Sequence, residues 1–345
     1  MDQKSLGRYE IVRSLEAAPW GSVYEAKDAV LQARVVLHCV HLRELSPEAA
    51  EQFTARFLAE AAAASRLAHP TIAAVTDYGR VDDCAYLVTQ QIEGVSLKDR
   101  LDRGERVPLP MAVALMRDLL SALAHAHGQG IVHQCVRPAN LLLANGRLRL
   151  TGFGMGCIQQ SEATTGAQLG ALSTGTRFMS PEQVRGQPLD ARSDVFSAGV
   201  VLYEMLTGTR PFDADNPFAI IQRILSVLPP PPTQLVPGLP AALDKALAGA
   251  LAKDKDARFA FARDFLRALE GFAPTPAPAP IPVAVATPAA GYQDAIALEL
   301  ELEYWKDIKE SEEAEDFLGY LKEFPAGRFV PLAHKRLRKM GQGTA

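Results

Sequence analysis

The sequence has few cysteines, the residues that build disulfide frameworks and many metal centres. Its 345 residues include four cysteines, Cys39, Cys84, Cys135 and Cys157, and no two of them stand at the spacing of paired metal ligands. Scattered cysteines are typical of free thiols in a reducing compartment. We therefore expect neither a disulfide framework nor a metal site.

A strong charge imbalance and long hydrophobic runs are also missing. The formal net charge is −4, from 36 Lys and Arg against 40 Asp and Glu, which predicts no basic surface for nucleic acid. No uninterrupted apolar run reaches the roughly 18–20 residues that span a bilayer. The first residues, MDQKSLGRYEIV, lack the apolar core of a secretory signal. We expect a soluble, cytoplasmic protein with no nucleic-acid or membrane partner.

The first part of the chain, to about Arg103, predicts a small antiparallel sheet with one inserted helix. The helix is expected over residues 46–68, with Ser46 as its N-cap, Pro47 at the first helical position and Glu48 at the positive end of the helix dipole. The predicted strands are residues 8–15, 21–28, 33–42, 71–79 and 84–92.

The second part, Leu109 to Gly271, is predominantly helical. Residues 111–130 show apolar positions at three- and four-residue spacing. Residues 194–208 are nearly all apolar, which indicates a buried central helix that ends at Gly208. Amphipathic helices are predicted over residues 240–254 and 261–271.

A Pro/Ala-rich segment then separates a short helical module from the rest. Alternating Pro and Ala in residues 272–290 favour an extended, semi-rigid linker, and the alternative is an ordered arm packed on the main domain. Helices are predicted at 292–311, 314–324 and 330–340. The module, residues 291–345, has little core for an independent fold, so we expect it to pair with itself, with the main domain or with a partner.

Six motifs in the first two parts follow one another in a familiar order: GRYEIV, IVHQCVRPANLLL, LTGFG, GTRFMSPEQ, DARSDVFSAGVVLYEMLTGTRPF and LAKDKDARF. Through them, residues 7–271 resemble the eukaryotic-like Ser/Thr protein kinases of bacteria. The resemblance implies an α+β, bilobal fold. The N-lobe, about 7–93, would hold the antiparallel sheet with one helix, and the C-lobe, about 94–271, would be mainly helical.

The loop that covers the nucleotide phosphates in kinases, Gly-x-Gly-x-x-Gly-x-Val, is degenerate here. The matching stretch is EAAPWGSV, in which Glu16 and Ala18 replace the first two glycines, while Gly21 and Val23 match. Glycine lets the backbone approach a phosphate closely. Glu16 adds a negative charge and Pro19 removes a backbone donor, so both disfavour a triphosphate.

The strand lysine that the resemblance implies is replaced by His38, in the text VVLH. Histidine has an unperturbed pKa of about 6.5 and a shorter side chain, so it is a poor bridge between two phosphates. Val36 stands where alanine roofs the adenine pocket. Glu60 matches the glutamate that pairs with the lysine, and we expect a contact between His38 and Glu60.

The positions matching the catalytic loop and the magnesium loop are also changed. Cys135 replaces the aspartate base, and a thiol with a pKa near about 8.5 is a poor proton acceptor for an alcohol. Arg137 replaces a lysine and keeps its charge, and Asn140 matches the magnesium-binding asparagine. Gly152 replaces the metal-binding aspartate, so Asn140 alone is insufficient for magnesium.

These substitutions predict a catalytically inactive pseudokinase that acts as a scaffold or allosteric regulator of protein partners, such as an active kinase or a signalling protein. One alternative is a weak or unconventional Ser/Thr kinase relying on Glu60, Arg137 and Asn140, and another is a nucleotide sensor without turnover. No cofactor is expected beyond weak ATP binding without magnesium. A residual nucleotide cleft would be lined by Gly21, Val23, Val36, His38, Thr89, Gln90, Ile92 and Leu142.

Two further features concern regulation and interaction. Candidate phosphorylation sites lie in the stretch matching the activation segment, for which the alternative is a solvated loop: Thr164, Thr165, Ser173, Thr174 and Thr176. The module at the C-terminal end resembles short, tetratricopeptide-type helical repeats appended to bacterial kinases and caspase-like proteins. Its apolar pattern indicates a small hydrophobic core and comprises Trp305, Phe317, Tyr320, Leu321, Phe324, Phe329 and Leu332.

Overall fold

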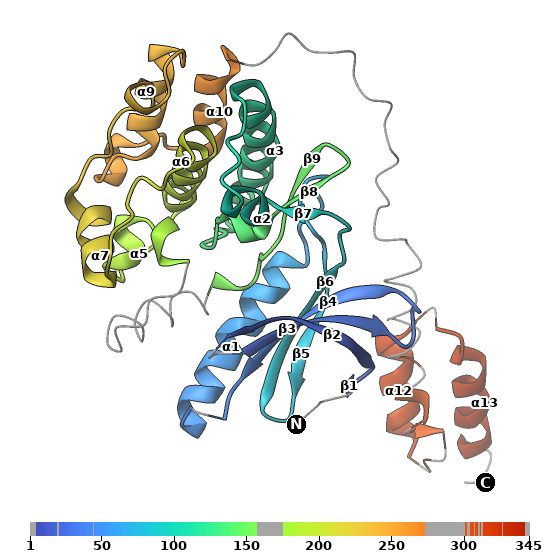
Figure 1. Ribbon diagram of the computed structural model, residues 1–345. Coiled ribbons are helices and arrows are strands. Elements are labelled where there is room, and N and C mark those ends of the chain that lie inside the picture. Colours follow the sequence, from blue (N-terminus) through green and yellow to red (C-terminus); the bar gives the residue numbers. More distant parts are fainter. Residues whose placement is uncertain are drawn as a thin grey trace. The chain divides into compact units, whose positions relative to one another are not determined.

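The computed structural model describes residues 5–18, 21–43, 45–156 and 175–272, and residues 301–341 except 302–303, 307, 310, 312 and 326 (Figure 1). The chain forms two compact units, Met1–Ile281 and Pro282–Ala345. The first unit contains two lobes, and the predicted linker at 272–290 lies outside the described residues except for Phe272.

The small lobe is a six-stranded antiparallel sheet in the order β1-β2-β3-β4-β6-β5. The two-residue strand β1 was not predicted, because two residues carry no periodic pattern. The other five strands were predicted within a few residues of their ends. The strands are β1 Ser5–Leu6, β2 Tyr9–Ala18, β3 Gly21–Asp28, β4 Arg34–His41, β5 Val75–Val81 and β6 Cys84–Gln90.

The two faces of this sheet enter different cores because successive side chains of a strand alternate. In β4, Leu37 and Cys39 belong to a small core that also holds Tyr9. Val40 belongs to the main core, together with Phe57 of helix α1. The face that carries Val40 is therefore turned towards α1 and the interior of the unit.

Helix α1, Pro47–Ala64, begins as its sequence predicts. The backbone N–H of Ala49 donates to Ser46 Oγ at 3.3 Å, Pro47 occupies the first turn and Glu48 supplies a negative charge there. These features satisfy an otherwise unpaired donor and complement the helix dipole.

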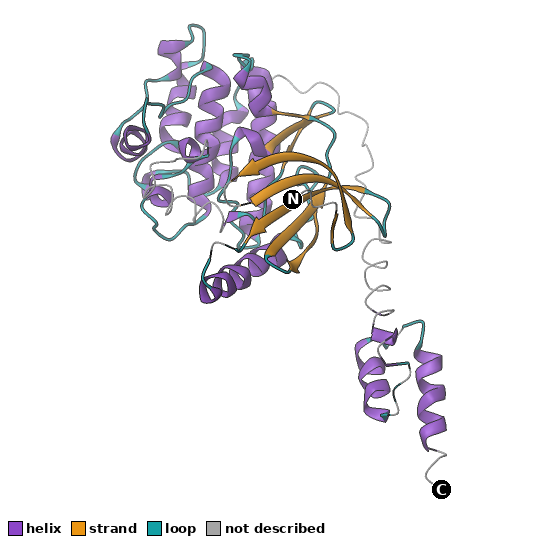
Figure 2. Ribbon diagram, turned by 60° about the horizontal axis from the view of Figure 1, so that its bottom comes forward, coloured by secondary structure: helices purple, strands orange, loops and turns teal. Residues whose placement is uncertain are grey.

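The large lobe is built mainly of helices, which Figure 2 shows beside the strands of the small lobe. Helix α6, Ala191–Thr207, is buried from Ser193 to Thr207 and ends at Gly208 with φ 72°, as predicted for a central helix. Helices α3 Leu109–Gly128, α8 Pro232–Leu235, α9 Ala241–Ala250 and α10 Ala262–Glu270 pack against it. The lobe also contains α2 Leu97–Asp102, α5 Pro181–Val184 and α7 Pro217–Ser226.

A three-stranded sheet lies between the lobes, in the order β7-β8-β9. It consists of β7 Val95–Ser96, β8 Leu141–Ala144 and β9 Arg147–Leu150. Leu150 joins this sheet to the small lobe, since its N–H donates to Thr71 O at 2.7 Å and its carbonyl accepts from Ala73 N at 2.8 Å. Short 3-10 helices lie at Pro138–Asn140, Thr176–Phe178 and Lys255–Ala257.

One described helix, α3, is long and apolar enough to cross a membrane by length and composition. In this structure 56% of that stretch is buried inside the unit, as in the core helix of a folded domain, so it is weak evidence for a membrane span.

The second unit holds α12, Ala314–Glu323, and α13, Val330–Gly341, close to the predicted ranges. Phe317 and Tyr320 are fully buried in its core, as their pattern predicts. Leu332 is instead 46% exposed, so its assignment to the core was wrong. Ala333, fully buried, takes the inward position on the same helix. Residues 292–300 of the first predicted helix lie outside the described residues.

Candidate active site

The loop that holds the candidate catalytic residues is fixed by Asp194 of α6, which is 1% exposed. Its Oδ2 accepts from His133 N at 2.7 Å and its Oδ1 from Gln134 N at 2.8 Å. His127 Nε2 lies 2.7 Å from the same Oδ2. These bonds set the path of the backbone just before Cys135.

His133 is a core histidine, 1% exposed. Its Nε2 lies 2.9 Å from the carbonyl oxygen of Thr151. Its ring meets the ring of Phe153 edge-on, with centroids 4.4 Å apart. Burial lowers the pKa of His133, although nearby Asp194 opposes the shift. A neutral, buried imidazole in these contacts connects the catalytic loop to the stretch matching the magnesium loop.

Cys135, Asn140 and Gly152 come together at the centre of the candidate site. The amide Nδ2 of Asn140 donates to Cys135 O at 2.8 Å and to Cys135 Sγ at 3.2 Å. A Cβ added at Gly152 would lie 2.9 Å from the same Nδ2, and Gly152 has φ +91°. The amide of Asn140 therefore occupies the space that a side chain at position 152 would enter.

A magnesium ion does not fit this set of donors. Magnesium in proteins is bound through carboxylates, phosphates and water, and the residues meeting here offer one neutral amide, one thiol and a glycine. Within the described ranges, no three His, Cys, Asp or Glu side chains form a group that could hold a metal ion.

His38 lies in the middle of β4, between Val23 of β3 and Leu87 of β6. Burial lowers the pKa of His38 to about 4, so its imidazole is neutral at pH 7. The structure thus puts an uncharged group where the resemblance implies a lysine.

The contact expected between His38 and Glu60 is not formed in the described part of the chain, so that prediction was wrong. Glu60 Oε1 instead accepts from Arg56 Nε at 3.3 Å, one turn earlier on α1. A neutral imidazole has no charge to attract the carboxylate, whereas Arg56 offers a full positive charge on the same helix face.

Gly21, the one glycine that matches the phosphate-covering loop, is explained by strand packing. A Cβ at this position would lie 1.9 Å from Cys39 O of the neighbouring strand. Ala18 and Gly21 pair at the ends of β2 and β3, and Glu16 in the same hairpin is exposed. Pro19, at the tip, lies outside the described residues.

Four of the predicted cleft residues share one face of the sheet. The ladder places Val23, His38 and Leu87 side by side, and next to them Val36 and Thr89. Thr89 is 3% exposed, while Val23, Val36 and His38 are partly exposed.

The remaining cleft residues lie at the border of the lobes. Gln90 ends β6, where its Oε1 accepts from Arg149 at 3.4 Å. Ile92 follows β6, and Leu142 pairs with Ser96 in the sheet between the lobes. The predicted cleft is thus assembled from both lobes.

A buried carboxylate on the cleft face was missed by the sequence analysis. Glu25 pairs across the sheet with Val36, and it is 2% exposed. It accepts from Arg13 Nε at 2.6 Å and from Arg34 at 3.1 Å. The bond from Arg13 holds the pKa of Glu25 below its usual range. The sequence offered a signal for this position: side chains alternate along a strand, so Glu25, two residues after Val23 in β3, lies on the same face of the sheet as Val23.

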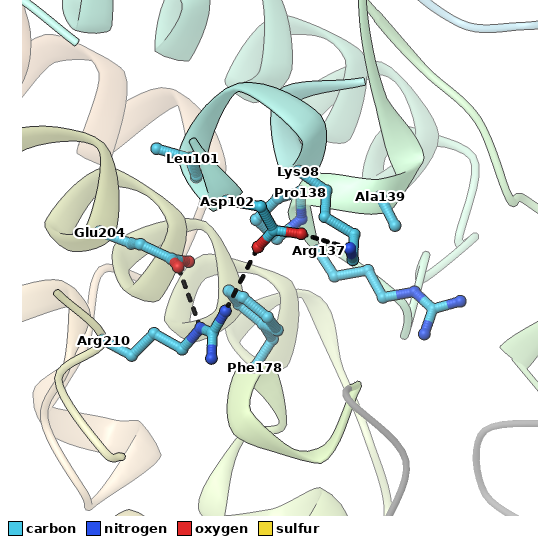
Figure 3. Close-up of a pocket in the computed structure, with 9 residues that line it drawn as sticks. All are labelled: Lys98, Leu101, Asp102, Arg137, Pro138, Ala139, Phe178, Glu204 and Arg210. Atoms are coloured by element: carbon cyan, nitrogen blue, oxygen red, sulfur yellow. Dashed lines mark hydrogen bonds and ion pairs between the residues drawn. The ribbon is translucent and has the colours of Figure 1, made fainter. Parts of the chain in front are cut away.

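A second missed feature is a cavity of about 160 Å³ beside the catalytic loop (Figure 3). Glu204, 6% exposed, accepts from Arg210 Nε at 3.0 Å through Oε1, and its Oε2 finds no hydrogen-bond donor among the described residues. Burial raises the pKa of Glu204. Arg137 lines the cavity, with its guanidinium directed away from Arg210 (Figure 3). The lining residues are Lys98, Leu101, Asp102, Arg137, Pro138, Ala139, Phe178, Glu204 and Arg210.

One of the predicted phosphorylation sites can be examined. Thr176 is 4% exposed in the 3-10 helix Thr176–Phe178, so its hydroxyl is inaccessible to a kinase in this conformation, and the prediction is corrected at that position. The others, Thr164, Thr165, Ser173 and Thr174, lie outside the described residues.

The end of the matching activation segment is anchored by a buried ion pair. Arg258 donates to Glu182 through both terminal nitrogens, at 2.6 and 2.8 Å, and the two side chains are 0% and 4% exposed. Ser193 Oγ donates to Glu182 as well, at 2.7 Å. This pair joins the glutamate of GTRFMSPEQ to the arginine of LAKDKDARF, as the resemblance to kinases implies.

Comparison with known proteins agrees with this architecture. The protein kinase domain family matches residues 9–266. The chain is 32% identical over 259 residues to the serine/threonine-protein kinase PrkC of Bacillus subtilis, covering 75% of this chain and 39% of the relative. It is 33% identical over 276 residues to PknB of Mycolicibacterium smegmatis, covering 77% and 44%.

The chain thus spans about two fifths of the length of these curated relatives. The matched region includes both lobes, the catalytic loop and the Glu182–Arg258 pair. With its six ordered motifs and its bilobal fold, the chain belongs to the protein kinase family, as a relative of bacterial Ser/Thr kinases.

Proposed function

We propose that this chain is a catalytically inactive member of the protein kinase family, which acts in the cytoplasm by binding other proteins as a scaffold or allosteric regulator. The observation that carries the proposal is the meeting of Cys135, Asn140 and Gly152, none of which carries a carboxylate. Phosphoryl transfer relies on positioned charges that neutralise the phosphates and on an acceptor for the proton of the attacking hydroxyl.

Each of these requirements is affected at a separate residue. His38 is neutral where a lysine would hold phosphates, and Cys135 is a thiol where an aspartate would accept a proton. Gly152 offers no ligand, and the amide of Asn140 fills the adjoining space. Three separate defects would have to be compensated at once, which supports a role without phosphoryl transfer.

The framework around this site is nevertheless held by buried hydrogen bonds and a buried ion pair. Asp194 holds the catalytic loop, and Arg258 holds Glu182 at the end of the activation segment. A large lobe held by these buried contacts suits a binding role, with an active kinase or another signalling protein as the partner. The module at 301–341 would supply a second binding surface, tethered through the Pro/Ala-rich segment at an effective concentration that the linker sets.

A weak Ser/Thr kinase is the second candidate function. The observation that favours it is the similarity to PrkC and PknB, both named as serine/threonine-protein kinases. Such an enzyme would have to rely on Glu60, Arg137 and Asn140. A nucleotide sensor without turnover is the third candidate, supported by the cleft face that carries Val23, Val36 and Thr89.

A two-stage experiment separates these functions. The full chain is first tested for a thermal shift with ATP and with ADP, each with and without magnesium. It is then incubated with γ-labelled ATP, magnesium and a generic protein substrate, next to the Asn140→Ala variant as a matched control. The proposal expects no transfer of label above background from either protein.

Each result favours one function. Magnesium-dependent transfer that Asn140→Ala abolishes would establish an enzyme and overturn the proposal. A magnesium-independent shift without transfer would indicate a nucleotide sensor. With neither shift nor transfer, the binding role stands, and partners captured with and without residues 291–345 would show which unit recruits them.

A further inference from the structure

Two of the four cysteines lie next to each other in the small lobe, outside the candidate active site. In the β4–β6 ladder, Cys39 pairs with Tyr86 and Cys84 pairs with His41. Cys39 and Cys84 are therefore diagonal neighbours, two residues out of register, and their side chains point to the same face of the sheet.

Both cysteines are free thiols in the same small core. Their exposed fractions are 2% for Cys39 and 8% for Cys84, so Cys84 is the more accessible of the two. As diagonal neighbours on one face of the sheet and members of one core, the two side chains lie side by side, and each thiol shifts the pKa of the other.

The surroundings of the two sulfurs differ in a way that assigns them different roles. Interaction with the Cys39 thiol lowers the pKa of Cys84, and the backbone N–H of Val40 and the charge of Arg43 act in the same direction. Interaction with the Cys84 sulfur, together with burial, raises the pKa of Cys39. Cys84 is thus the sulfur that more readily becomes the nucleophilic thiolate.

We propose that Cys39 and Cys84 are a redox modification site, at which a peroxide converts the two thiols into a reversible intramolecular disulfide. The thiolate of Cys84 attacks one peroxide oxygen, the O–O bond breaks, and the departing hydroxide takes up a proton to become water. The sulfur of Cys39 then displaces the hydroxyl of the Cys84 sulfenic acid, which leaves with the Cys39 proton as a second water. Two thiols are oxidised by two electrons, and the peroxide is reduced.

The position of the pair gives the bond a measurable consequence. It would tie β4, which carries His38 next to Cys39, to β6 at the point where the two strands are already paired. It would also close the chain between residues 39 and 84, and a cross-link across a loop of this length restricts the unfolded state. We expect the oxidised protein to melt roughly 5–10 °C above the reduced one.

The experiment treats the reduced full chain with a small excess of hydrogen peroxide, unfolds it in a thiol-alkylating reagent and maps the peptides by mass spectrometry. The expected product is a cross-linked pair of peptides containing Cys39 and Cys84, lighter by two hydrogen atoms, which dithiothreitol reverses. The variant C135A/C157A should give the same product, because the other two cysteines take no part.

The variants C39A and C84A serve as matched controls, each removing one sulfur from the pair. In C39A the remaining Cys84 should be converted to its sulfenic acid, which a dimedone probe captures, and no cross-link should appear. The rise in melting temperature should be lost in both variants.

Three results with the wild-type chain would overturn the proposal. In the first, both Cys39 and Cys84 remain fully alkylatable after peroxide treatment. In the second, peroxide converts them only to sulfinic acids and no cross-link forms. A disulfide that instead joins Cys135 or Cys157 to another cysteine would also contradict it.

Discussion

The buried pair of Glu182 and Arg258 allows a quantitative test of what holds the large lobe together. Arg258 makes five hydrogen bonds: two to the Glu182 carboxylate and one each to the carbonyls of Ala252, Lys253 and Arg192. Replacing Arg258 with Met keeps much of the apolar volume of the side chain but removes every one of these donors.

The main cost of Arg258→Met is the charge that it leaves behind. Glu182, 3% exposed, would retain the bond from Ser193 at 2.7 Å and lose its only cationic partner among the described residues. Breaking a buried ion pair in this way costs about 3–5 kcal/mol of unfolding free energy. For a domain of this size we expect the melting temperature to fall by roughly 6–10 °C.

Urea unfolding followed by circular dichroism measures the loss, and Arg267→Met is the matched control. Arg267 is 73% exposed and lies 3.6 Å from Asp264, so its removal should cost less than about 1 kcal/mol. The double variant Glu182→Gln with Arg258→Met should recover part of the loss, because no carboxylate remains buried.

The pH dependence of the two proteins gives an independent check. Burial alone would raise the pKa of Glu182, but the bonds from Arg258 and Ser193 outweigh it and hold the pKa below its usual value. The wild-type pair therefore stabilises the fold fully above the ordinary Glu pKa of about 4.3, and this contribution is lost as the pH falls through the lowered value. In Arg258→Met burial raises the pKa of Glu182, so the difference in unfolding free energy between the wild type and the variant should narrow as the pH falls. Equal losses in Arg258→Met and Arg267→Met would refute the reasoning.

Three further predictions concern the small lobe and the candidate active site. At an ordinary strand position Ala is more stable than Gly by roughly 0.5–1 kcal/mol, but Gly21→Ala should destabilise the fold because its Cβ would meet Cys39 O. Gly128→Ala, whose Cβ meets nothing within 4 Å, should not destabilise it, and equal effects of the two substitutions in thermal melts would contradict this. The pKa of His38 is lowered to about 4 in the folded protein, against about 6.5 in the unfolded chain. The wild-type protein should therefore lose unfolding free energy as the pH falls from about 6.5 towards 4, and His38→Gln should reduce this pH dependence in urea unfolding. Cys135→Asp or His38→Lys alone should give no transfer of labelled phosphate, because each leaves the other positions unchanged; activity of either single variant would show that one residue had been limiting.

Local patterns were sufficient to predict most of the fold. Ser46 and Gly208 mark the helix ends that the structure has, because caps act within a few residues of the chain. The pairing of Glu182 with Arg258 could be predicted only through the resemblance, since 76 positions separate the two residues. Glu25 was missed although strand alternation from Val23 places it on the cleft face, because its partners Arg13 and Arg34 come from neighbouring strands.

The candidate site was harder to predict at the residues that differ from the kinase pattern, because their contacts have no counterpart in the family. The resemblance to kinases led us to expect a contact between His38 and Glu60, as between the lysine and the glutamate of a kinase. The structure pairs Glu60 with Arg56, since a substitution that removes a charge also removes the reason for the old contact. The contact between Asn140 and Cys135 Sγ likewise depends on a thiol for which the family pattern offers no precedent.

Matching motif residues therefore carry less information about activity here than the changed ones. Gly21 is required by the carbonyl of Cys39, His133 is held by Thr151 and Phe153, and Arg258 by Glu182, each through contacts that need no nucleotide. Residues that make such contacts match between relatives because they stabilise the fold, so an identity of 32–33% to bacterial Ser/Thr kinases does not show that phosphate is transferred. The proposal of inactivity rests on His38, Cys135 and Gly152, which is why the phosphate-transfer assay, and not further similarity, decides it.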